Sequence, residues 1–413
     1  MFVLIWFLDI IRINLHFLNP FNETIRDYEI TDIVYSRLRD QKINSDNRIV
    51  LVNTGLPDRD TLRMMIDRIR KAGAKVIAVD LLLSERQNMH TDSLLRLSMQ
   101  RMENIVLGIE IDGYTDESGI FKIQKGCDSF FCDHVYSGFI NFIAVDSSST
   151  IRYFSPREMT IEGESLSFAA RTAKLYDPQA AERLFNRNRE VEEIYYAGNE
   201  DQFVQYEPRD ILDTTINLRQ GFLDKIVLIG FLGNYTWDKD RHLTPLNHHY
   251  TGRNTPDMYG VVIHANIIRM ILDNTYVREL SFWANLLLTF VFCYFNIHLF
   301  YQIFRRVSLP YQFITRFLQL AEIIVLFFIV AVLFHFYRIK MDVAYWITAL
   351  LLTFDAVKFY DNVIRKRFVL LSRIPHEFPP TKKIPKRVEK PIEQPQEGQP
   401  LATDTPTKTT LKE

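Results

Sequence analysis

The stretch "RIVLVNTGLPDRDTLRMMIDRIRKAGAKVIAVDLLL", residues 48–83, contains two apolar runs separated by an amphipathic segment. The first run, 48–55, is rich in β-branched residues and ends in glycine, as strands often do. The second, 74–83, is apolar at nearly every residue, which is typical of a strand buried on both faces. Between them, apolar residues recur at the spacing of one helix face: Leu62, Met65, Ile66 and Ile69. These residues predict a β-α-β unit with parallel strands and a right-handed crossover.

The ends of this predicted helix are marked as well, because Asp58 or Asp60 can cap its start and Gly73 can end it. The alternation of helix and strand continues along the chain. Further helices are expected over 92–102 and 165–176, and further strands over 104–111, 138–145, 193–198, 203–206 and 225–231. This order predicts an α/β domain with a largely parallel sheet and flanking helices, extending over residues 20–279.

Three later segments predict an α-helical transmembrane bundle. The mean hydropathy of −0.07 and the net charge of −1 do not indicate these segments, because both values describe the chain as a whole. Residues 280–304 contain no Asp, Glu, Lys or Arg, and 317–337 contain only Glu322. Each exceeds or matches the roughly 20 apolar residues that cross a bilayer. A third span is expected over 343–360, which carries Asp355 and Lys358 near its end.

The first residues, 1–19, are apolar but interrupted by Asp9 and Arg12, and we interpret them as a transmembrane or signal-anchor segment. Arginine and lysine are concentrated in 305–316 and 358–373, which places those loops in the cytoplasm. Residues 20–279 are then extracytoplasmic. Half of the sixteen prolines fall in 372–413, so this tail is expected to be disordered and cytoplasmic.

Several segments in this order resemble the CHASE type-two domain, an extracellular sensory module associated with cyclases and histidine kinases. The matching segments are "DYEITDIVYSRLRD" (27–40), "AKVIAVDLLLSE" (74–85), "GFINFIAVDSSSTIRYF" (138–154), "SLSFAARTA" (165–173), "KIVLIGFLG" (225–233) and "TP" (244–245) with "PDMYGVVIHANIIRMIL" (256–272). The resemblance implies a sensory domain with one span before it and about three after it. Many relatives carry a kinase or cyclase, whereas a short tail follows the spans in this sequence.

A ligand crevice is expected outside the carboxyl ends of the parallel strands. Asp80 is the sharpest candidate, although a carboxylate there can equally cap a helix or accept from backbone amides. The other ligand-binding candidates are Asn53, Gly230, Gly233, Asn234, Asp238 and His242. The "GFLGN" segment lacks the full dinucleotide-binding fingerprint, and we expect no cofactor.

Histidines are clustered near the end of the domain, at positions 242, 248, 249 and 264, together with Asp238 and Asp240. These residue types bind zinc, but their spacing matches no known ligand pattern, so no metal or catalytic site is predicted. His264 shares a helical face with Val261, Ile268 and Ile271. We expect it to serve the fold, with a buried hydrogen bond. His248 and His249 are expected in an exposed loop, where a pH-sensing role is an alternative.

Two cysteines, Cys127 and Cys132, lie five residues apart, and an oxidising compartment would allow them to form a disulfide. Two unrelated thiols are an equally good interpretation. Cys293 lies inside a predicted span and is interpreted as apolar filling.

The sequence therefore predicts a sensor in the bacterial inner membrane, not an enzyme, that binds an unknown extracytoplasmic ligand and passes the signal to a separate cytoplasmic effector. We expect membrane lipid as a partner and no nucleic acid. The oligomeric state is left open, with a homodimer as one alternative. Two other hypotheses remain, an extracytoplasmic metal-dependent hydrolase and a membrane scaffold.

Overall fold

The structure is a computed structural model that describes residues 30–38, 45–55, 58–115, 120–143, 149–233, 240–247, 255–306 and 311–365. The predicted anchor segment at 1–19 and the tail at 372–413 lie outside these residues, as do Asn234, Asp238, His248 and His249.

A parallel sheet forms the centre of the domain. Its strands follow the order β10 (Phe203–Tyr206), β1 (Asp46–Asn53), β11 (Ile226–Gly230), β2 (Val76–Val79), β3 (Ile105–Thr115) and β5 (Tyr136–Phe139). Every neighbouring pair in this order is parallel, so the predicted α/β class with a largely parallel sheet is confirmed. Beyond β3 the sheet continues through β4 (Ile120–Lys125), β7 (Arg157–Thr160) and β8 (Gly163–Leu166), where antiparallel pairs dominate.

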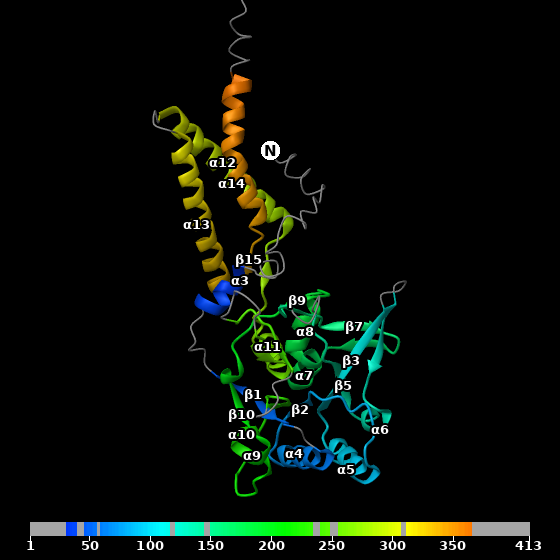
Figure 1. Cartoon of the computed structure of the whole chain (residues 1–413). Helices are drawn as coiled ribbons and strands as arrows, with labels where there is room; N and C mark the ends of the chain where they lie inside the picture. Colours follow the sequence, from blue (N-terminus) through cyan, green and yellow to red (C-terminus); the bar gives the residue numbers. More distant parts are fainter. Residues whose placement is uncertain are drawn as a thin grey trace, which may run out of the picture. The chain divides into compact units, whose positions relative to one another are not determined.

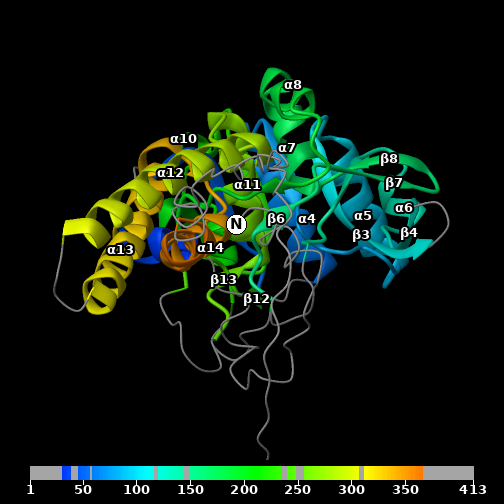
Figure 2. The ribbon, with the colours of Figure 1, turned by 90° about the horizontal axis from the view of Figure 1, so that it is seen from above.

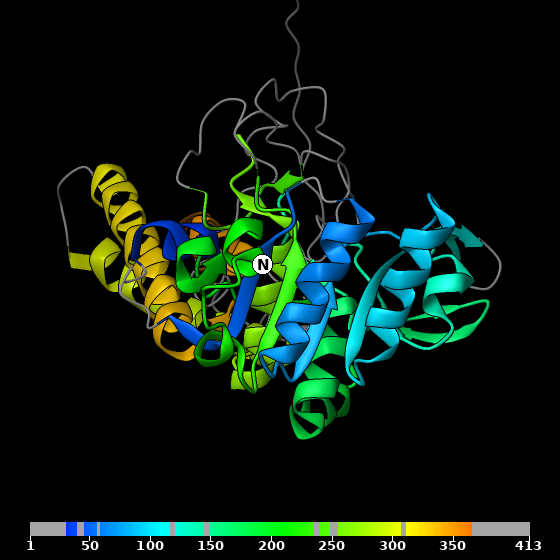
Figure 3. The same ribbon diagram turned by 90° about the horizontal axis from the view of Figure 1, so that it is seen from below.

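Helices cover both faces of the sheet (Figure 1). One face carries α4 (Arg59–Lys71), α5 (Met89–Gln100), α9 (Pro208–Leu212) and α10 (Arg219–Phe222), with α4 and α5 in front of the strands in Figure 3. The other carries α7 (Phe168–Tyr176), α8 (Pro178–Asn186) and α11 (Gly260–Asp273), seen in Figure 2. Successive side chains of β1 alternate between the two cores: Ile49 and Leu51 pack with α11, and Val50 and Val52 pack with α4.

The β-α-β unit at 48–83 forms as its sequence predicts, although its second strand, expected over 74–83, is β2 and ends at Val79. Asp58 caps α4, since its carboxylate accepts a hydrogen bond of 2.7 Å from the Thr61 amide. After α4, Gly73 takes a φ of +90°, a conformation that favours glycine. The apolar face of α4 is buried: Leu62, Met65, Ile66 and Ile69.

Two further predicted strands are shorter or absent in the structure. In both places an asparagine side chain forms hydrogen bonds with the backbone in place of a neighbouring strand. The strand expected at 138–145 ends at Phe139, and the Asn141 amide group then bonds the Ile111 backbone at 2.8 and 3.0 Å. The strand expected at 193–198 is wrong beyond β9 (Glu192–Glu193). There the Asn266 Oδ1 atom accepts hydrogen bonds from the amides of Ala197 and Gly198.

Short elements connect the domain to the segments around it. These are α3 (Ile30–Ile33), the π-helix η2 (Val34–Leu38), α6 (Ser129–Cys132), β6 (Tyr153–Phe154), the 3-10 helix η3 (Glu200–Gln202), β12 (Arg241–His242), β13 (Met258–Tyr259), β14 (Arg278–Glu279) and β15 (Ile339–Lys340). Strand β6 pairs with β9, β12 with β13, and β14 with β15.

Three apolar helices follow the domain: α12 (Phe282–Arg306), α13 (Tyr311–Tyr337) and α14 (Ala344–Phe359), which continues as the π-helix η4 (Tyr360–Arg365). Phe282–Ile303 and Ile314–Tyr337 are long and apolar enough to cross a membrane, whereas α14 has only 16 residues. Large apolar side chains on the first two helices are mostly exposed, including Trp283 at 75% and Phe328 at 69%. Core helices of soluble proteins bury such residues, so this exposure favours membrane association.

A buried ion pair fixes the first described helix to the domain. The Arg152 guanidinium meets the Asp32 carboxylate at 2.6 Å, and the two side chains are 7% and 6% exposed. The pair joins α3 to the residue just before β6.

We expect Arg152→Met to lower the free energy of unfolding by about 3–5 kcal/mol, because the Asp32 carboxylate would stay buried without its charge partner. Urea denaturation of the full-length protein in detergent, followed by circular dichroism, measures this. Arg157→Met is the control, since its pair with Glu164 is 41% and 51% exposed and should contribute less than about 1 kcal/mol. Equal losses in both variants would contradict the prediction.

Candidate functional site

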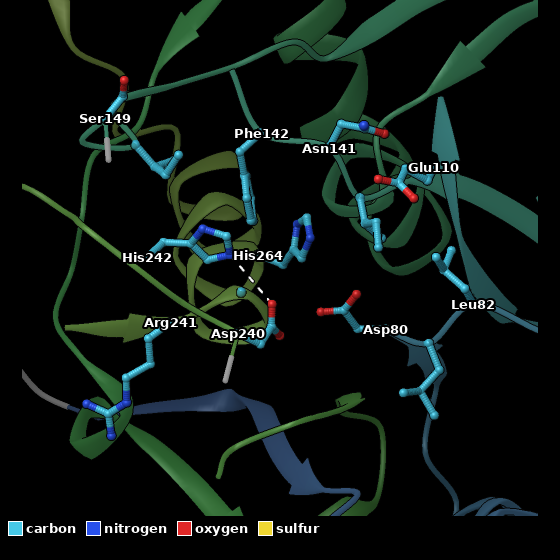
Figure 4. Close-up of a pocket in the computed structure, with 14 residues that line it drawn as sticks. Asp80, Leu82, Glu110, Asn141, Phe142, Ser149, Asp240, Arg241, His242 and His264 are labelled. Carbon is cyan, nitrogen blue, oxygen red and sulfur yellow. Dashed lines mark ion pairs between the residues drawn. The ribbon is translucent and has the colours of Figure 1, made fainter. Parts of the chain in front are cut away.

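A cavity of about 720 Å³ opens at the carboxyl ends of β2 and β5, beside Glu110 in the middle of β3 (Figure 4). This is the edge of a parallel sheet at which ligands are generally bound. Elements from several parts of the chain build its wall, which consists of Asp80, Leu81, Leu82, Glu110, Ile140, Asn141, Phe142, Ser149, Ile151, Asp240, Arg241, His242, Gly260 and His264. Two of the predicted ligand-binding residues, Asp80 and His242, therefore lie at one cavity.

Asp80 is the first residue after β2, and its backbone amide donates to the Ile229 carbonyl at 2.8 Å, which fixes the residue beside β11. Its side chain lines the cavity, and no hydrogen-bond partner within the described part of the chain meets the carboxylate. Burial and, to a smaller extent, the negative charge of Asp240 together raise the pKa of Asp80 to about 7. The carboxyl group can therefore exchange a proton close to neutral pH.

Asp240 and His242 lie over the start of α11. The His242 Nε2 atom is 3.6 Å from the Asp240 Oδ1 atom, as the dashed line in Figure 4 marks. The Asp240 backbone carbonyl accepts from the Gly260 amide at 3.3 Å, and its φ of +71° is unusual for a residue with a side chain. A Cβ atom at Gly260 would lie 3.5 Å from the Asp240 carboxylate and 3.7 Å from His242. Because Gly260 has no side chain, its backbone lies directly against the Asp240 and His242 side chains at the cavity.

His264 lies one turn further along α11 and is only 3% exposed. Its ring packs between Phe142 and Phe168, with centroid distances of 4.7 and 5.0 Å. Burial, with a smaller contribution from nearby His242, lowers the pKa of His264 to about 3, while a hydrogen bond with the Ile140 backbone opposes the shift. The imidazole is therefore neutral at physiological pH. Its Nδ1 atom is buried and has no hydrogen-bond partner among the residues described.

The sequence led us to expect that His264 serves the fold through a buried hydrogen bond. The structure places the ring in the core, as this prediction requires, but the ring also forms part of the cavity wall. With the Nδ1 atom unpartnered, a structural role and a ligand-contacting role are both compatible with this position.

Asn53 lies away from the cavity, and its amide group is fully used. The Nδ2 atom donates to Glu207 Oε2 at 3.1 Å and to the Gly233 carbonyl at 3.0 Å. The Oδ1 atom accepts from the amides of Gly55 and Leu232, each at 3.0 Å. Asn53 therefore joins the loops that follow β1 and β11, which is a structural task.

The two glycine candidates permit close packing beside the cavity. A Cβ atom at Gly230 would lie 2.7 Å from the Val261 side chain and 3.3 Å from the Asp80 side chain. One at Gly233, where φ is +88°, would lie 2.3 Å from the Tyr259 hydroxyl. Both positions need glycine so that α11 and the residue before it can approach the end of β11.

Cys127 and Cys132 form a disulfide in the structure, with their Cα atoms 5.9 Å apart. The bridge spans α6, on the face of the sheet covered by α4 and α5. It does not line the cavity.

Four cavity residues were not predicted from the sequence: Glu110, Asn141, Phe142 and Arg241. Glu110 gave a usable signal, since it is a carboxylate within the otherwise apolar run "NIVLGIEI". Asn141 and Phe142 gave none, because they fell inside a predicted strand. Among the residues that the structure describes, no three His, Cys, Asp or Glu side chains converge as a metal ion would require.

We expect Asp80→Asn to raise the melting temperature by a few degrees at pH 8, with the gain disappearing towards pH 4. The pKa of Asp80 in the folded protein, about 7, lies above its ordinary value of 3.8, so the wild type loses stability as the pH rises from about 4 to 7, and this cost is fully present above pH 7. Thermal unfolding of the full-length protein between pH 4 and 8 measures this.

His264→Gln is the matched control, because the pH dependence of its effect on stability should have the opposite sign. The folded pKa of His264, about 3, lies below its ordinary value of 6.5, so the wild type should lose stability relative to this variant as the pH falls below 6.5. A pH-independent difference for Asp80→Asn would show that the Asp80 carboxyl titrates normally.

Comparison with known proteins assigns the family. The CHASE2 domain family matches residues 29–298, which is more than half of the 413-residue chain. The match includes every element that lines the cavity and ends within α12. No curated protein and no solved structure gives a significant match. The resemblance seen in the sequence is thus confirmed, and the chain belongs to the CHASE2 family of extracellular sensory domains.

Proposed function

We propose that this protein is a membrane-bound sensor that binds a small molecule in the cavity at the carboxyl ends of β2 and β5 and transmits the binding event to its apolar helices. One observation carries this proposal: two separate parts of the cavity wall, α11 and the segment around Ile151, continue directly into contacts with the apolar helices.

The first connection runs along α11. Gly260 and His264 line the cavity at its start, and the helix ends at Asn274, whose φ of +53° stops it. Tyr276 and Val277 are then buried at 4% and 1% exposure, so the connection to α12 is packed rather than loose. Because helices are stiff, a shift of Gly260 would be carried to β14 and the start of α12.

The second connection runs through β6. Ile151 lines the cavity, and two residues later the Tyr153 hydroxyl accepts a hydrogen bond of 3.0 Å from Lys340 Nζ. Lys340 also pairs with Glu193 at 3.1 Å. Lys340 lies in β15, in the short connection between α13 and α14. A movement of Ile151 can therefore reach the loop that joins these two helices.

The two connections meet in one small joint. Strands β14 and β15 are parallel, with Arg278 donating to the Arg338 carbonyl at 2.8 Å and Leu280 donating to the Lys340 carbonyl at 3.0 Å. Just before β15, the Phe334 ring of α13 packs against Tyr35 of η2 with centroids 5.3 Å apart. A ligand shifts such a joint only by its differential affinity for two arrangements of it.

The rest of the proposal concerns the membrane. The arginine and lysine asymmetry supports a multi-pass protein of the bacterial inner membrane, with residues 20–279 extracytoplasmic. Lipid acyl chains would solvate the exposed aromatic side chains of α12 and α13. We propose that the proline-rich and lysine-rich segment 372–413 binds a separate cytoplasmic effector.

Reporter fusions test the topology. A fusion after Arg373 should give cytoplasmic reporter activity, and one at Asp128 should give extracytoplasmic activity, because positively charged loops stay in the cytoplasm. The reverse pattern would refute this topology and the sensor proposal built on it.

A thermal-shift screen of the full-length protein against small metabolites tests the sensor function. A binder should stabilise the wild type and the control Ser129→Trp, which changes an exposed residue of α6, but not Ser149→Trp, which places a bulky side chain at the cavity wall. The same binder should change hydrogen exchange at residues 338–342. A binder that still stabilises Ser149→Trp, or that leaves exchange in the joint unchanged, would argue against the proposal.

A further inference from the structure

The charges around the cavity are predominantly acidic. Three carboxylates line it, from Asp80, Glu110 and Asp240, against the single guanidinium of Arg241. That guanidinium lies over the Tyr259 ring at 4.3 Å and donates to the Tyr259 hydroxyl at 2.9 Å. Since His264 is neutral, its ring does not offset the carboxylates. The electrostatic potential in the cavity therefore favours a cation.

An acidic lining alone does not establish a site, but two polar groups here also lack partners. The Asp80 carboxylate has none among the residues described, and neither does the His264 Nδ1 atom, although His264 is almost completely buried. In Figure 4 the Asp80 and Asp240 carboxylates and the His264 ring face the same space. Buried polar groups are nearly always satisfied, so an occupant that donates hydrogen bonds would complete this arrangement.

Apolar side chains also form part of the wall. Leu82, Ile140, Phe142 and Ile151 lie around the polar centre, and the volume of about 720 Å³ is within the range of small-molecule sites. The Phe142 ring packs against the rings of His242 and His264, with centroid distances of 5.4 and 4.7 Å, and adds aromatic surface to this wall. An occupant that suits this wall has an apolar body as well as a charged head.

An anion fits less well, even though α11 begins at the cavity. The Gly260 amide already donates to the Asp240 carbonyl, and the Asp240 carboxylate lies close to the Gly260 Cα atom. A metal ion is also disfavoured, because no three suitable ligands converge in the part of the chain that is described.

We infer that the cavity binds a small organic cation, whose ammonium group lies between Asp80 and Asp240 and donates to His264, and whose apolar body packs against Phe142 and Ile151. This inference rests on the proposed sensor function and specifies the chemical class of its ligand.

Three probes of equal skeleton and different charge test the inference: 2-phenylethylammonium, 2-phenylethanol and phenylacetate. Calorimetric titration of the full-length protein in detergent at pH 8 should give a Kd for the ammonium at least about tenfold lower than for the alcohol, with no binding of phenylacetate. Asp80→Asn should remove this preference for the cation. Asp128→Asn should keep it, because Asp128 pairs with Arg86 outside the cavity.

The pH dependence provides a second readout. Asp80 must be ionised to bind the ammonium, and its pKa is about 7 in the unliganded protein. The affinity for the ammonium should therefore fall by up to about tenfold per unit as the pH drops below 7, and this loss should be absent in Asp80→Asn. The other ionisable groups around Asp80 are Glu110, Asp240, Arg241, His242 and His264, and they are unchanged in that variant.

The outcomes separate this inference from the sensor proposal. Equal or tighter binding of phenylacetate or 2-phenylethanol would overturn the cationic ligand while leaving the cavity as a binding site. No binding of any probe would also overturn it, and the sensor proposal would then be decided by the metabolite screen with Ser149→Trp.

Discussion

The arrangement of this domain depends on the close approach of α11 to the end of β11, which only glycine allows. A Cβ atom at Gly230 would lie 2.7 Å from Val261, too close for any side chain without displacing the helix. Because Gly230 leaves this space empty, the start of α11 lies beside Asp80, and His264 one turn later reaches the cavity. The same helix is buried along its length and leads to α12. One glycine therefore places the cavity and the route to the apolar helices on a single rigid element.

The cavity contains polar side chains whose hydrogen bonds are not all formed within the described residues. Asp80 and His264 each keep an unpartnered atom within the described structure, and both side chains face the same cavity. Other buried atoms also lack a hydrogen-bond partner, such as Asp92 Oδ1 and Tyr276 Oη, but they lie outside the cavity. Groups whose pKa values are strongly shifted are concentrated at functional sites. The convergence of two such unpartnered groups on one cavity is the physical reason to regard it as a site.

The joint of β14 and β15 gives the domain a specific connection to the apolar helices. A parallel pair of two-residue strands is weak by itself, so its position depends on the packing around it. Lys340 holds the joint to Tyr153 and Glu193, and Phe334 holds it to Tyr35. These contacts come from β6, β9 and η2, the elements that the Arg152–Asp32 ion pair also fixes. An element with few contacts of its own, held by charged groups, is suited to having two arrangements.

The sequence by itself determined the local elements: the β-α-β unit at 48–83 with its cap at Asp58, the α/β class and the long apolar helices. Apolar periodicity reports which face of an element is buried, and caps report where it ends, so both can be read locally. Only the tertiary structure decided that Asp80 belongs to the cavity and Asn53 does not, although both lie at the carboxyl ends of strands of the same sheet. That distinction arises because β11 pairs between β1 and β2, and because 140–142 and 240–242 fold over the end of β2. Strand order and loop placement depend on contacts between residues far apart in the chain, which no local pattern encodes.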